Sequence, residues 1–332
     1  MPQANRQILL DRLPQGPLGP EHFRLVETAL PQPADGEVLV RTRYISLDAA
    51  NRAWMMGATY RSALGAGQVM SGDAMGEVVE SKDPSLKPGD LVAGDFGWQD
   101  YAVLPAPQLL KLPNIEPMTH LMSLYSTAGL TAYFGLLDCG ELKDGETVVV
   151  SAAAGSVGSL VGQIAKIKGC RVVGIAGGPE KCAWLTDELG FDLAVDYKAG
   201  DLRRQMREAV PNGIDVYFDN VGGQILDTCL FNMNVHGRVV GCGAISAYDT
   251  DAPPYVLRAV PALLLMKRLT FRGFLVMDYY DQRERALKDL QAWVAAGQLK
   301  VKEDILDGLE STPRALIGLL NGDNLGKRMV RV

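Results

Sequence analysis

Residues 147–176, TVVVSAAAGSVGSLVGQIAKIKGCRVVGIA, have the order strand, glycine turn, helix, strand. Three successive valines begin the stretch, AAAGSVG provides the turn, and residues 159–168 repeat apolar side chains at helical spacing. A dinucleotide-binding βαβ unit needs this order. Gly155 and Gly158 leave no side chain between the backbone and a pyrophosphate, so the helix can present its N-terminal N–H groups to phosphates. The alternative is a tight βα turn that binds no ligand.

The length and composition indicate a globular protein with two cores. The chain has 332 residues, of which 47% are hydrophobic and 22% charged. A net charge of -6 disfavours nucleic acid as a partner. The polar N-terminus lacks the apolar core of a secretory signal, and no apolar run is long enough to span a bilayer. We therefore expect no membrane association and a cytoplasmic location.

Cysteine and histidine usage disfavours a metal site. The five cysteines are scattered without a CxxC pair, which favours reduced thiols over disulfides or a zinc knuckle. Only three histidines are present, and they are widely spaced. We therefore predict that the protein holds no metal.

The chain changes character along its length. Up to about residue 114, short strand-like runs alternate with Pro and Gly turns, which is typical of a β-rich, barrel-like domain. From residue 147, strands and helices alternate, which predicts a doubly wound, mostly parallel sheet. Strand-like ends around a short helix follow residue 300, so we expect the C-terminus to return to the first domain. Helices are expected at residues 179–189, 201–209, 224–232, 256–267 and 281–296.

The end of the second strand, residues 171–176, favours NADP over NAD. In an NAD site this strand ends in an acid that holds the ribose hydroxyls. Gly177 and Gly178 occupy that place here, and Lys181 follows one turn into the helix, where it can reach a 2′-phosphate. The alternative is that Lys181 is an ordinary solvated helix lysine.

Five segments together resemble the zinc-independent branch of the medium-chain dehydrogenase/reductase superfamily, near the prostaglandin reductase and alkenal double-bond reductase group. They are GLTAYFGL (129–136), AAAGSVGSLVGQIAKIKGC (152–170), FDNVGG (218–223), GAISAY (243–248) and GDNLGK (322–327). The resemblance covers nearly the whole chain. It implies an α/β fold, NADPH as cofactor and a homodimer. It also implies a GroES-like β-rich catalytic domain at residues 1–122 and 301–332 and a Rossmann domain at residues 123–300.

The resemblance also implies which residues bind the cofactor. Lys181 and Tyr197 are expected to contact the 2′-phosphate. Asn220 and Asn324, whose amides can both donate and accept, are expected beside the ribose and the nicotinamide. The full expected set is Gly155, Ser156, Val157, Gly158, Gly178, Lys181, Tyr197, Asn220, Cys242, Tyr248, Phe274, Val276 and Asn324.

The superfamily's zinc enzymes hold their catalytic metal with Cys, His and an acid in the first domain. This chain has no cysteine before Cys139, and Ser71-Gly72-Asp73 stands where a His-Glu pair is expected. Metal-assisted alcohol oxidation is therefore disfavoured. Without a Lewis acid, the acceptor must be activated by conjugation, as in an enal or enone. Hydride then adds to the β-carbon, charge develops on the carbonyl oxygen, and the α-carbon is protonated.

Tyr248 is the predicted catalytic residue. It follows GAIS at the end of a strand, where ligands bind in open α/β sheets, and its O–H could stabilise the enolate or supply a proton. The alternative is a packing tyrosine at the domain cleft. Where the related reductases read DPYMR, with a tyrosine that faces the substrate, this chain reads DAANR at residues 48–52. We expect Asn51, Tyr60 and Trp98 to shape the substrate pocket instead.

The sequence leaves two other functions open. One is reduction of a quinone or a carbonyl by the same fold, and the other is a non-catalytic NADPH-binding protein that regulates a partner. The expected partner of the leading hypothesis is a small conjugated carbonyl compound. The apolar strand expected at residues 269–276 is a plausible sheet edge that a second subunit could cover.

Overall fold

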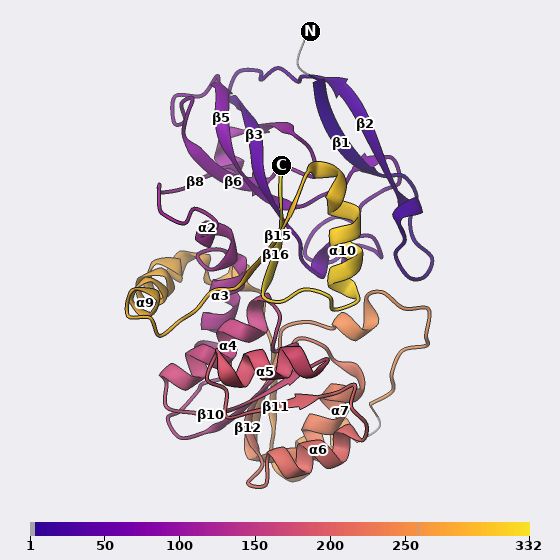
Figure 1. Cartoon of the computed structure of the whole chain (residues 1–332), viewed down its shortest axis with the longest axis vertical. Helices are drawn as coiled ribbons and strands as arrows, with labels where there is room; N and C mark the ends of the chain where they lie inside the picture. The colour runs from indigo at the N-terminus through magenta and orange to yellow at the C-terminus, as the bar shows by residue number, and fades with distance from the viewer. Residues whose placement is uncertain (1–3, 258) are drawn as a thin grey trace.

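The structure is a computed structural model that describes residues 4–257 and 259–332. Figure 1 shows two domains, a β-rich domain that holds the N-terminus and a Rossmann domain whose helices flank a parallel sheet. The predicted α/β fold class, with a β-rich domain and a doubly wound parallel sheet, is confirmed. None of the described helices is both long and apolar enough to cross a membrane.

Two sheets form the β-rich domain, with the strand orders β2-β1-β4 and β15-β16-β3-β5-β6-β8, and β7 also pairs with β3. The central strand is β3, because Val38, Val40 and Ile45 have no exposed surface and pack in one core cluster. The strands are β1 (Ala4–Leu10), β2 (Phe23–Ala29), β3 (Glu37–Ser46), β4 (Gln68–Val69), β5 (Asp73–Ser81), β6 (Leu91–Asp95), β7 (Tyr101–Pro105), β8 (Leu110–Lys111), β15 (Glu303–Asp307) and β16 (Lys327–Arg331). The helical elements are α1 (Ala50–Ala53), α10 (Thr312–Leu320), η1 (Pro20–His22), η2 (Ala106–Gln108) and η6 (Leu309–Ser311).

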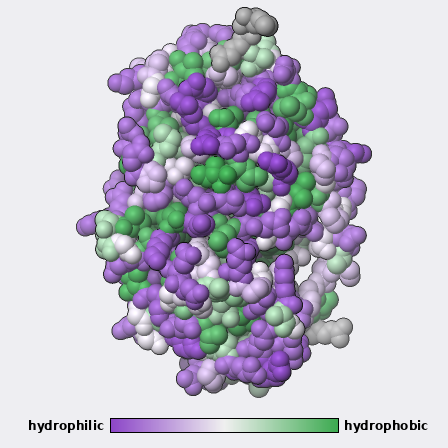
Figure 2. Space-filling view, in the orientation of Figure 1, coloured by the Kyte–Doolittle hydropathy of each residue, from purple (hydrophilic) through white to green (hydrophobic). Residues whose placement is uncertain are grey.

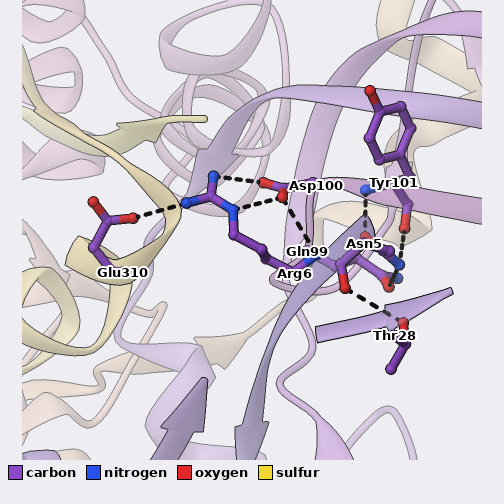
Figure 3. Close-up of polar contacts among 7 residues, drawn as sticks. All are labelled: Asn5, Arg6, Thr28, Gln99, Asp100, Tyr101 and Glu310. Atoms are coloured by element: carbon purple, nitrogen blue, oxygen red, sulfur yellow. Dashed lines mark hydrogen bonds and ion pairs between the residues drawn. The ribbon is translucent and has the colours of Figure 1, made fainter. Parts of the chain in front are cut away.

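The C-terminal segment returns to the β-rich domain, as predicted. β16 runs antiparallel to β3, with Met329 opposite Ser46. The close-up in Figure 3 shows a second link: Arg6 of β1 binds the carboxylate of Asp100 at 2.7 and 3.1 Å, and its Nη1 atom lies 3.5 Å from Glu310. The first strand and the returning segment are thus fixed to the same domain.

A short helical region connects the two domains. It consists of α2 (His120–Ser123), α3 (Thr127–Phe134) and one π-helical turn, η3 (Gly135–Cys139). The six parallel strands of the Rossmann domain follow in the spatial order β11-β10-β9-β12-β13-β14. They are β9 (Thr147–Ser151), β10 (Arg171–Ala176), β11 (Leu193–Asp196), β12 (Ile214–Asp219), β13 (Met233–Gly241) and β14 (Thr270–Gly273). Their helices are α4 (Ser156–Ile167), α5 (Pro179–Asp187), α6 (Leu202–Ala209), α7 (Gly223–Asn232), α8 (Val260–Lys267), α9 (Arg283–Ala295), η4 (Ile245–Ala247) and η5 (Val276–Gln282).

The valine run of β9 explains the two layers of helices. Successive side chains of a strand face opposite sides of a sheet. Val148 and Val150 therefore belong to the core cluster that includes α3, α4 and α9, whereas Val149 belongs to the cluster that includes α6, α7 and α8. All three valines are fully buried, as expected for a strand that is covered on both faces.

Two expected elements are shorter than the sequence pattern predicts. The helix expected at 256–267 begins only at Val260, and position 258 lies outside the described residues. Pro261 explains this start, because it has no N–H and is tolerated in the first turn of a helix but not in its interior. The strand expected at 269–276 spans only Thr270–Gly273, since Val276 already begins η5. In both cases apolar residues lie beyond the observed helix or strand, so the apolar pattern of the sequence did not indicate where the element begins or ends.

The face of the molecule seen in Figure 1 carries no single large apolar patch. Figure 2 shows its hydrophobic residues in small groups separated by hydrophilic ones. Such scattered apolar groups are normal on a protein surface.

Candidate active site

The glycine turn after β9 brings the N-terminus of α4 close to the strand end. A Cβ atom on Gly158 would lie 2.3 Å from the carbonyl oxygen of Ala152, so only glycine permits this approach. Ser156 begins α4, and its buried Oγ atom has no hydrogen-bond partner among the described residues. An unpartnered hydroxyl at the N-terminus of a helix suits an anionic group such as a pyrophosphate.

The C-terminal segment completes this turn from the β-rich domain. The N–H of Gly326 donates to the carbonyl oxygen of Ala154 at 2.8 Å, and Gly326 forms an isolated parallel bridge with Gly155. Asn324 is 9% exposed, and its Nδ2 atom donates to the carbonyl oxygen of Gly326 at 2.9 Å. The structure thus places Asn324 beside the glycine turn although 169 positions separate it from Gly155 in the numbering (324 − 155).

A cationic site surrounds the two glycines after β10. A Cβ atom on Gly177 would lie 2.9 Å from both Tyr197 Cε1 and Lys198 Cε. Lys181 points to the same region, where burial and then the charge of Lys198 lower its pKa, and its Nζ atom donates to the carbonyl oxygen of Gly322 at 2.6 Å. Two lysines and a tyrosine around backbone without side chains suit a phosphate monoester.

Asp196 is a carboxylate that binds the backbone of this cationic site. Its Oδ1 atom accepts hydrogen bonds from the N–H groups of Gly178 and Lys198, both at 2.9 Å. These two backbone donors offset part of its negative charge and hold the turn of Gly178, whose φ is 94°. Asp196 therefore shapes the site rather than occupying the place of a ribose-binding acid after β10.

The FDNVGG turn after β12 is organised around the buried carboxylate of Asp219. Asp219 Oδ1 accepts from Tyr217 Oη at 2.7 Å, from Gly222 N at 2.9 Å and from Val221 N at 3.0 Å. Asn220 is 6% exposed, and its Nδ2 atom donates to the carbonyl oxygen of Ser151 at 2.7 Å. This network fixes Asn220 at the carboxyl end of the sheet, where ligands bind in such folds.

Three more expected cofactor residues lie at the ends of β13 and β14. The N–H of Cys242 donates to the carbonyl oxygen of Asp219 at 2.8 Å, and burial raises the pKa of its thiol to about 12. Phe274 packs over Gly135, where a Cβ atom would lie 2.5 Å from the Phe274 ring. Val276 is partly buried against the same core cluster. All three side chains are partly buried against the core cluster that includes Phe218.

Tyr248 ends the GAISAY turn and folds back on it. Its Oη atom accepts a hydrogen bond from the N–H of Ala244 at 3.1 Å. Because that contact uses a lone pair of the oxygen, the hydroxyl proton stays available for an acceptor in the cleft. The neighbouring Ser246 fixes the turn, since its Oγ atom donates to the carbonyl oxygen of Val221 at 2.6 Å.

The β-rich domain contributes a polar wall at the start of α1. Lys327 of β16 is 4% exposed, and its ammonium lies 2.6 Å from Asp48 Oδ1. Asn51 is 1% exposed; its Oδ1 atom accepts from Asp48 N and its Nδ2 atom donates to Ser71 O. Both ends of the Asn51 amide are therefore used to hold this wall.

The other two residues expected in the substrate pocket differ in position. Tyr60 is half exposed, and its hydroxyl accepts from Trp54 Nε1 at 3.3 Å, with Arg61 over the Trp54 ring. Trp98, by contrast, is fully buried in the core of the β-rich domain and stacks on Phe23 with ring centroids 5.6 Å apart. The structure therefore corrects the prediction for Trp98, which is a core residue. Trp98 lies in the bend between β6 and β7, where no strand or helix periodicity indicates whether a side chain faces the core.

Asp73 is an acidic residue of the β-rich domain whose position the sequence did not reveal. It begins β5 directly opposite Asp95 of β6, and its side chain reaches solvent. Burial by surrounding protein, followed by the charges of Asp48 and Asp95, raises its pKa to about 6. Asp73 also acts electrostatically on Tyr60 and on Tyr280 of η5, so it lies between the two domains.

Lys198 and Asp73 are the site residues that sequence reasoning missed. Lys198 directly follows Tyr197, so the YK pair after β11 was a usable signal. In the sequence, Asp73 was considered only because Ser71-Gly72-Asp73 replaces the His-Glu pair of the zinc enzymes. Within residues 4–257 and 259–332, no group of three or more His, Cys, Asp or Glu side chains is placed to hold a metal ion.

Comparison with known proteins gives matches to both domains and to the whole chain. Residues 6–112 match the family described as "N-terminal domain of oxidoreductase", and residues 156–292 match the family described as "Zinc-binding dehydrogenase". The chain is 43% identical over 337 residues to "NADPH-dependent curcumin reductase" of Escherichia coli (strain K12), covering 99% of this chain and 97% of that protein.

Two further matches bear on the site. "2-alkenal reductase (NADP(+)-dependent)" of Nicotiana tabacum is 40% identical over 301 residues, covering 89% of this chain and 87% of that protein. Among solved structures, "CurA in complex with NADPH" from Vibrio vulnificus is 40% identical, with a TM-score of 0.93 and coverage of 98% of this chain and 99% of that one.

Replacing Asp48 by Asn is expected to lower the pKa of Asp73 below its present value of about 6. The change removes a neighbouring negative charge and leaves the Lys327 ammonium without its ion-pair partner. Carboxyl ¹³C NMR of aspartate-labelled protein, recorded from about pH 3 to about pH 8, measures the pKa of Asp73. Asp90→Asn, which removes the partner of Lys111 in the β-rich domain, is the matched control and should leave Asp73 unchanged.

The sign of the linked stability follows from the same shift. The pKa of Asp73 in the fold lies above its ordinary value of 3.8, so the folded state favours the protonated carboxyl. Its contribution to stability is fully present below pH 3.8 and is lost as the pH rises through about 6. An Asp73 pKa that stays the same or rises in Asp48→Asn would contradict this electrostatic account.

Proposed function

Since the chain belongs to the zinc-independent branch of the medium-chain dehydrogenase/reductase superfamily, in the prostaglandin reductase and alkenal double-bond reductase group, we propose that it reduces the C=C bond of α,β-unsaturated aldehydes and ketones with NADPH. This proposal rests on the similarity to two reductases, which are 43% and 40% identical to this chain over 99% and 89% of its length. Their names specify NADPH or NADP⁺, and one of them also names an alkenal. The residues at the carboxyl ends of the strands support it.

The described residues fit NADPH at three places. Ser156 Oγ and the N-terminus of α4 suit the pyrophosphate, and Lys181 with Lys198 suits the 2′-phosphate. Asn220, held by Ser151, suits the ribose and carboxamide end. When bound, NADPH supplies the hydride that adds to the β-carbon of the substrate.

Tyr248 is the proposed catalytic residue. Its hydroxyl oxygen accepts from Ala244 N–H, so the Tyr248 proton can be donated to the substrate carbonyl oxygen as negative charge develops there. Tyr60 and the Asp48–Lys327 wall are proposed to bound the substrate from the β-rich domain.

We further propose that the protein is a homodimer joined through β14. This strand ends the six-stranded sheet, and all four of its residues are exposed. Leu265 and Met266 of the preceding helix are 76% and 69% exposed, and Phe271 of β14 is 42% exposed. An edge strand with free backbone groups beside apolar side chains suits pairing with a second copy.

The domain limits and the cellular location are also part of this proposal. We place the domain limits at residues 1–122 with 301–332 and at 123–300, which agrees with the membership of the sheets. We also propose a cytoplasmic location, supported by five free cysteines. Fractionation of cells that express the protein would test the location, and limited proteolysis would test the limits.

Tyr248→Phe is expected to lower kcat for an enone by about 10²-fold, the range for loss of one acid catalyst, while NADPH affinity stays unchanged. The measurement is NADPH oxidation with a panel of enals, enones, quinones and saturated ketones, followed by NMR of the products. Tyr255→Phe, whose hydroxyl lies near Asp227 on the helix face, is the matched control.

The panel separates the alternatives. Saturated aldehyde or ketone products establish C=C reduction. Alcohol or hydroquinone products would replace it with carbonyl or quinone reduction, and tight NADPH binding without turnover of any acceptor would indicate a binding protein. Full activity of Tyr248→Phe would remove Tyr248 from the mechanism.

Lys181→Ala and Lys198→Ala are each expected to reduce the preference for NADPH over NADH. Each removes one charged partner of the 2′-phosphate, a loss on the order of 1.5–3 kcal/mol in NADPH affinity with little change for NADH. Fluorescence titration with both nucleotides measures the ratio. Lys166→Ala, which removes the partner of Asp192, is the control, and an unchanged ratio in both site variants would place the 2′-phosphate elsewhere.

Sedimentation velocity tests the dimer. Phe271→Lys places a charge in the middle of β14 and should shift the protein from dimer to monomer without unfolding it. Leu25→Lys, at an exposed position of β2, is the matched control and should remain dimeric. A monomeric wild-type protein would overturn the proposal.

A further inference from the structure

One ion pair joins the two domains at the edge of the active site. Arg52 Nε of α1 lies 2.8 Å from Asp249 Oδ1, and the two side chains are 4% and 14% exposed. Of the ion pairs formed by residues 4–257 and 259–332, this is the one that connects the β-rich domain with the segment between β9 and β14. We call Arg52 and Asp249 the interdomain pair.

Further hydrogen bonds anchor both members of the interdomain pair. Arg52 Nη2 donates to the carbonyl oxygen of Gly16 at 2.9 Å. Asp249 Oδ1 accepts a second hydrogen bond from the N–H of Leu18, also at 2.8 Å. Two separate segments of the β-rich domain therefore hold the same carboxylate oxygen, and the position of Asp249 is strongly determined.

The interdomain pair adjoins the turn that carries Tyr248. Asp249 is the next residue in the chain, and Tyr248 Oη accepts from Ala244 N–H within the same turn. On its other side the turn is tied to the Rossmann domain, because Ser246 N and Oγ both donate to Val221 O, at 3.1 and 2.6 Å. Tyr248 thus lies between one anchor in each domain.

Stability alone does not account for the interdomain pair. Burying two charges has a desolvation cost that often cancels their attraction. Arg52 Nη1 is buried and has no partner among the described residues, and such an unsatisfied buried donor lowers stability. The interdomain pair is therefore better explained by its effect on the position of the neighbouring turn.

We propose that Arg52 and Asp249 are positioning residues that hold the Tyr248 hydroxyl at a fixed place relative to the substrate wall of the β-rich domain. The inference rests on the proposed catalytic role of Tyr248. Asp249 fixes the backbone at the end of the turn, and Arg52 fixes Asp249 to α1, which also carries Asn51 of that wall. A displacement of about 1 Å at a reacting group can lower a rate by about 10²-fold, so such a constraint bears directly on turnover.

The test compares three variants by enone kinetics, NADPH titration, thermal unfolding and amide hydrogen exchange. Asp249→Ala should lower kcat by about 10- to 100-fold with NADPH affinity unchanged, and should speed exchange in residues 243–250. Asp249→Asn keeps the Oδ1 acceptor for Leu18 and Arg52 and should retain most of kcat. Glu146→Ala breaks the similarly buried Arg238–Glu146 pair inside the Rossmann domain, so it should lower stability without lowering kcat.

A double variant separates a positioning role from general destabilisation. In Tyr248→Phe, which lacks the hydroxyl, adding Asp249→Ala should cause little further loss of kcat. Losses that multiply would overturn the positioning role, as would a normal kcat in Asp249→Ala. Full activity of Tyr248→Phe alone would instead overturn the proposed role of Tyr248, and with it this inference.

A folding failure of Asp249→Ala would leave the test intact. Asp249→Glu keeps the charge and moves the carboxylate by one methylene, so it should lower kcat while the protein stays folded. A normal kcat in Asp249→Glu, with exchange of residues 243–250 unchanged, would contradict the proposal.

Discussion

The close contact between Gly158 and the carbonyl of Ala152 is the constraint on which the active site depends. Because no side chain separates the two backbones, α4 begins directly at the end of β9. The N-terminus of α4 then lies at the carboxyl edge of the sheet, beside Asn220, and Gly326 bonds to the same turn. A larger residue at position 158 would separate all of these groups at once.

The site is assembled from both domains, and the chain order makes this possible. The C-terminal segment leaves the Rossmann domain, pairs with β3 and brings Asn324 and Lys327 to the cleft. The Arg52–Asp249 pair joins the domains at a second point, next to Tyr248. Cofactor-side and substrate-side residues therefore have a fixed relation that neither domain provides alone.

Much of this arrangement could be predicted from local sequence signals. The glycine turn, the alternation of strands and helices and the Gly177-Gly178 end of β10 each follow from short-range backbone rules, and the structure bears out the fold that they imply. Contacts that depend on distant parts of the chain could not be predicted. Arg52 and Asp249 are 197 positions apart, and no local pattern marks them as a pair. Trp98 was misplaced for a related reason, because it lies in the bend between β6 and β7 and stacks on Phe23, which is 75 positions earlier in the chain (98 − 23).

The state of the thiols has a consequence for the chemistry of the substrates. Enals and enones are electrophiles that alkylate thiolates by conjugate addition, and the thiolate is the reactive form of cysteine. The chain has five cysteines, and burial is the first cause that raises the pKa of each thiol: Cys139, Cys170, Cys182, Cys229 and Cys242. At neutral pH every thiol is therefore protonated, including Cys242 at the end of β13. The protein can therefore handle reactive acceptors without offering them a thiolate of its own.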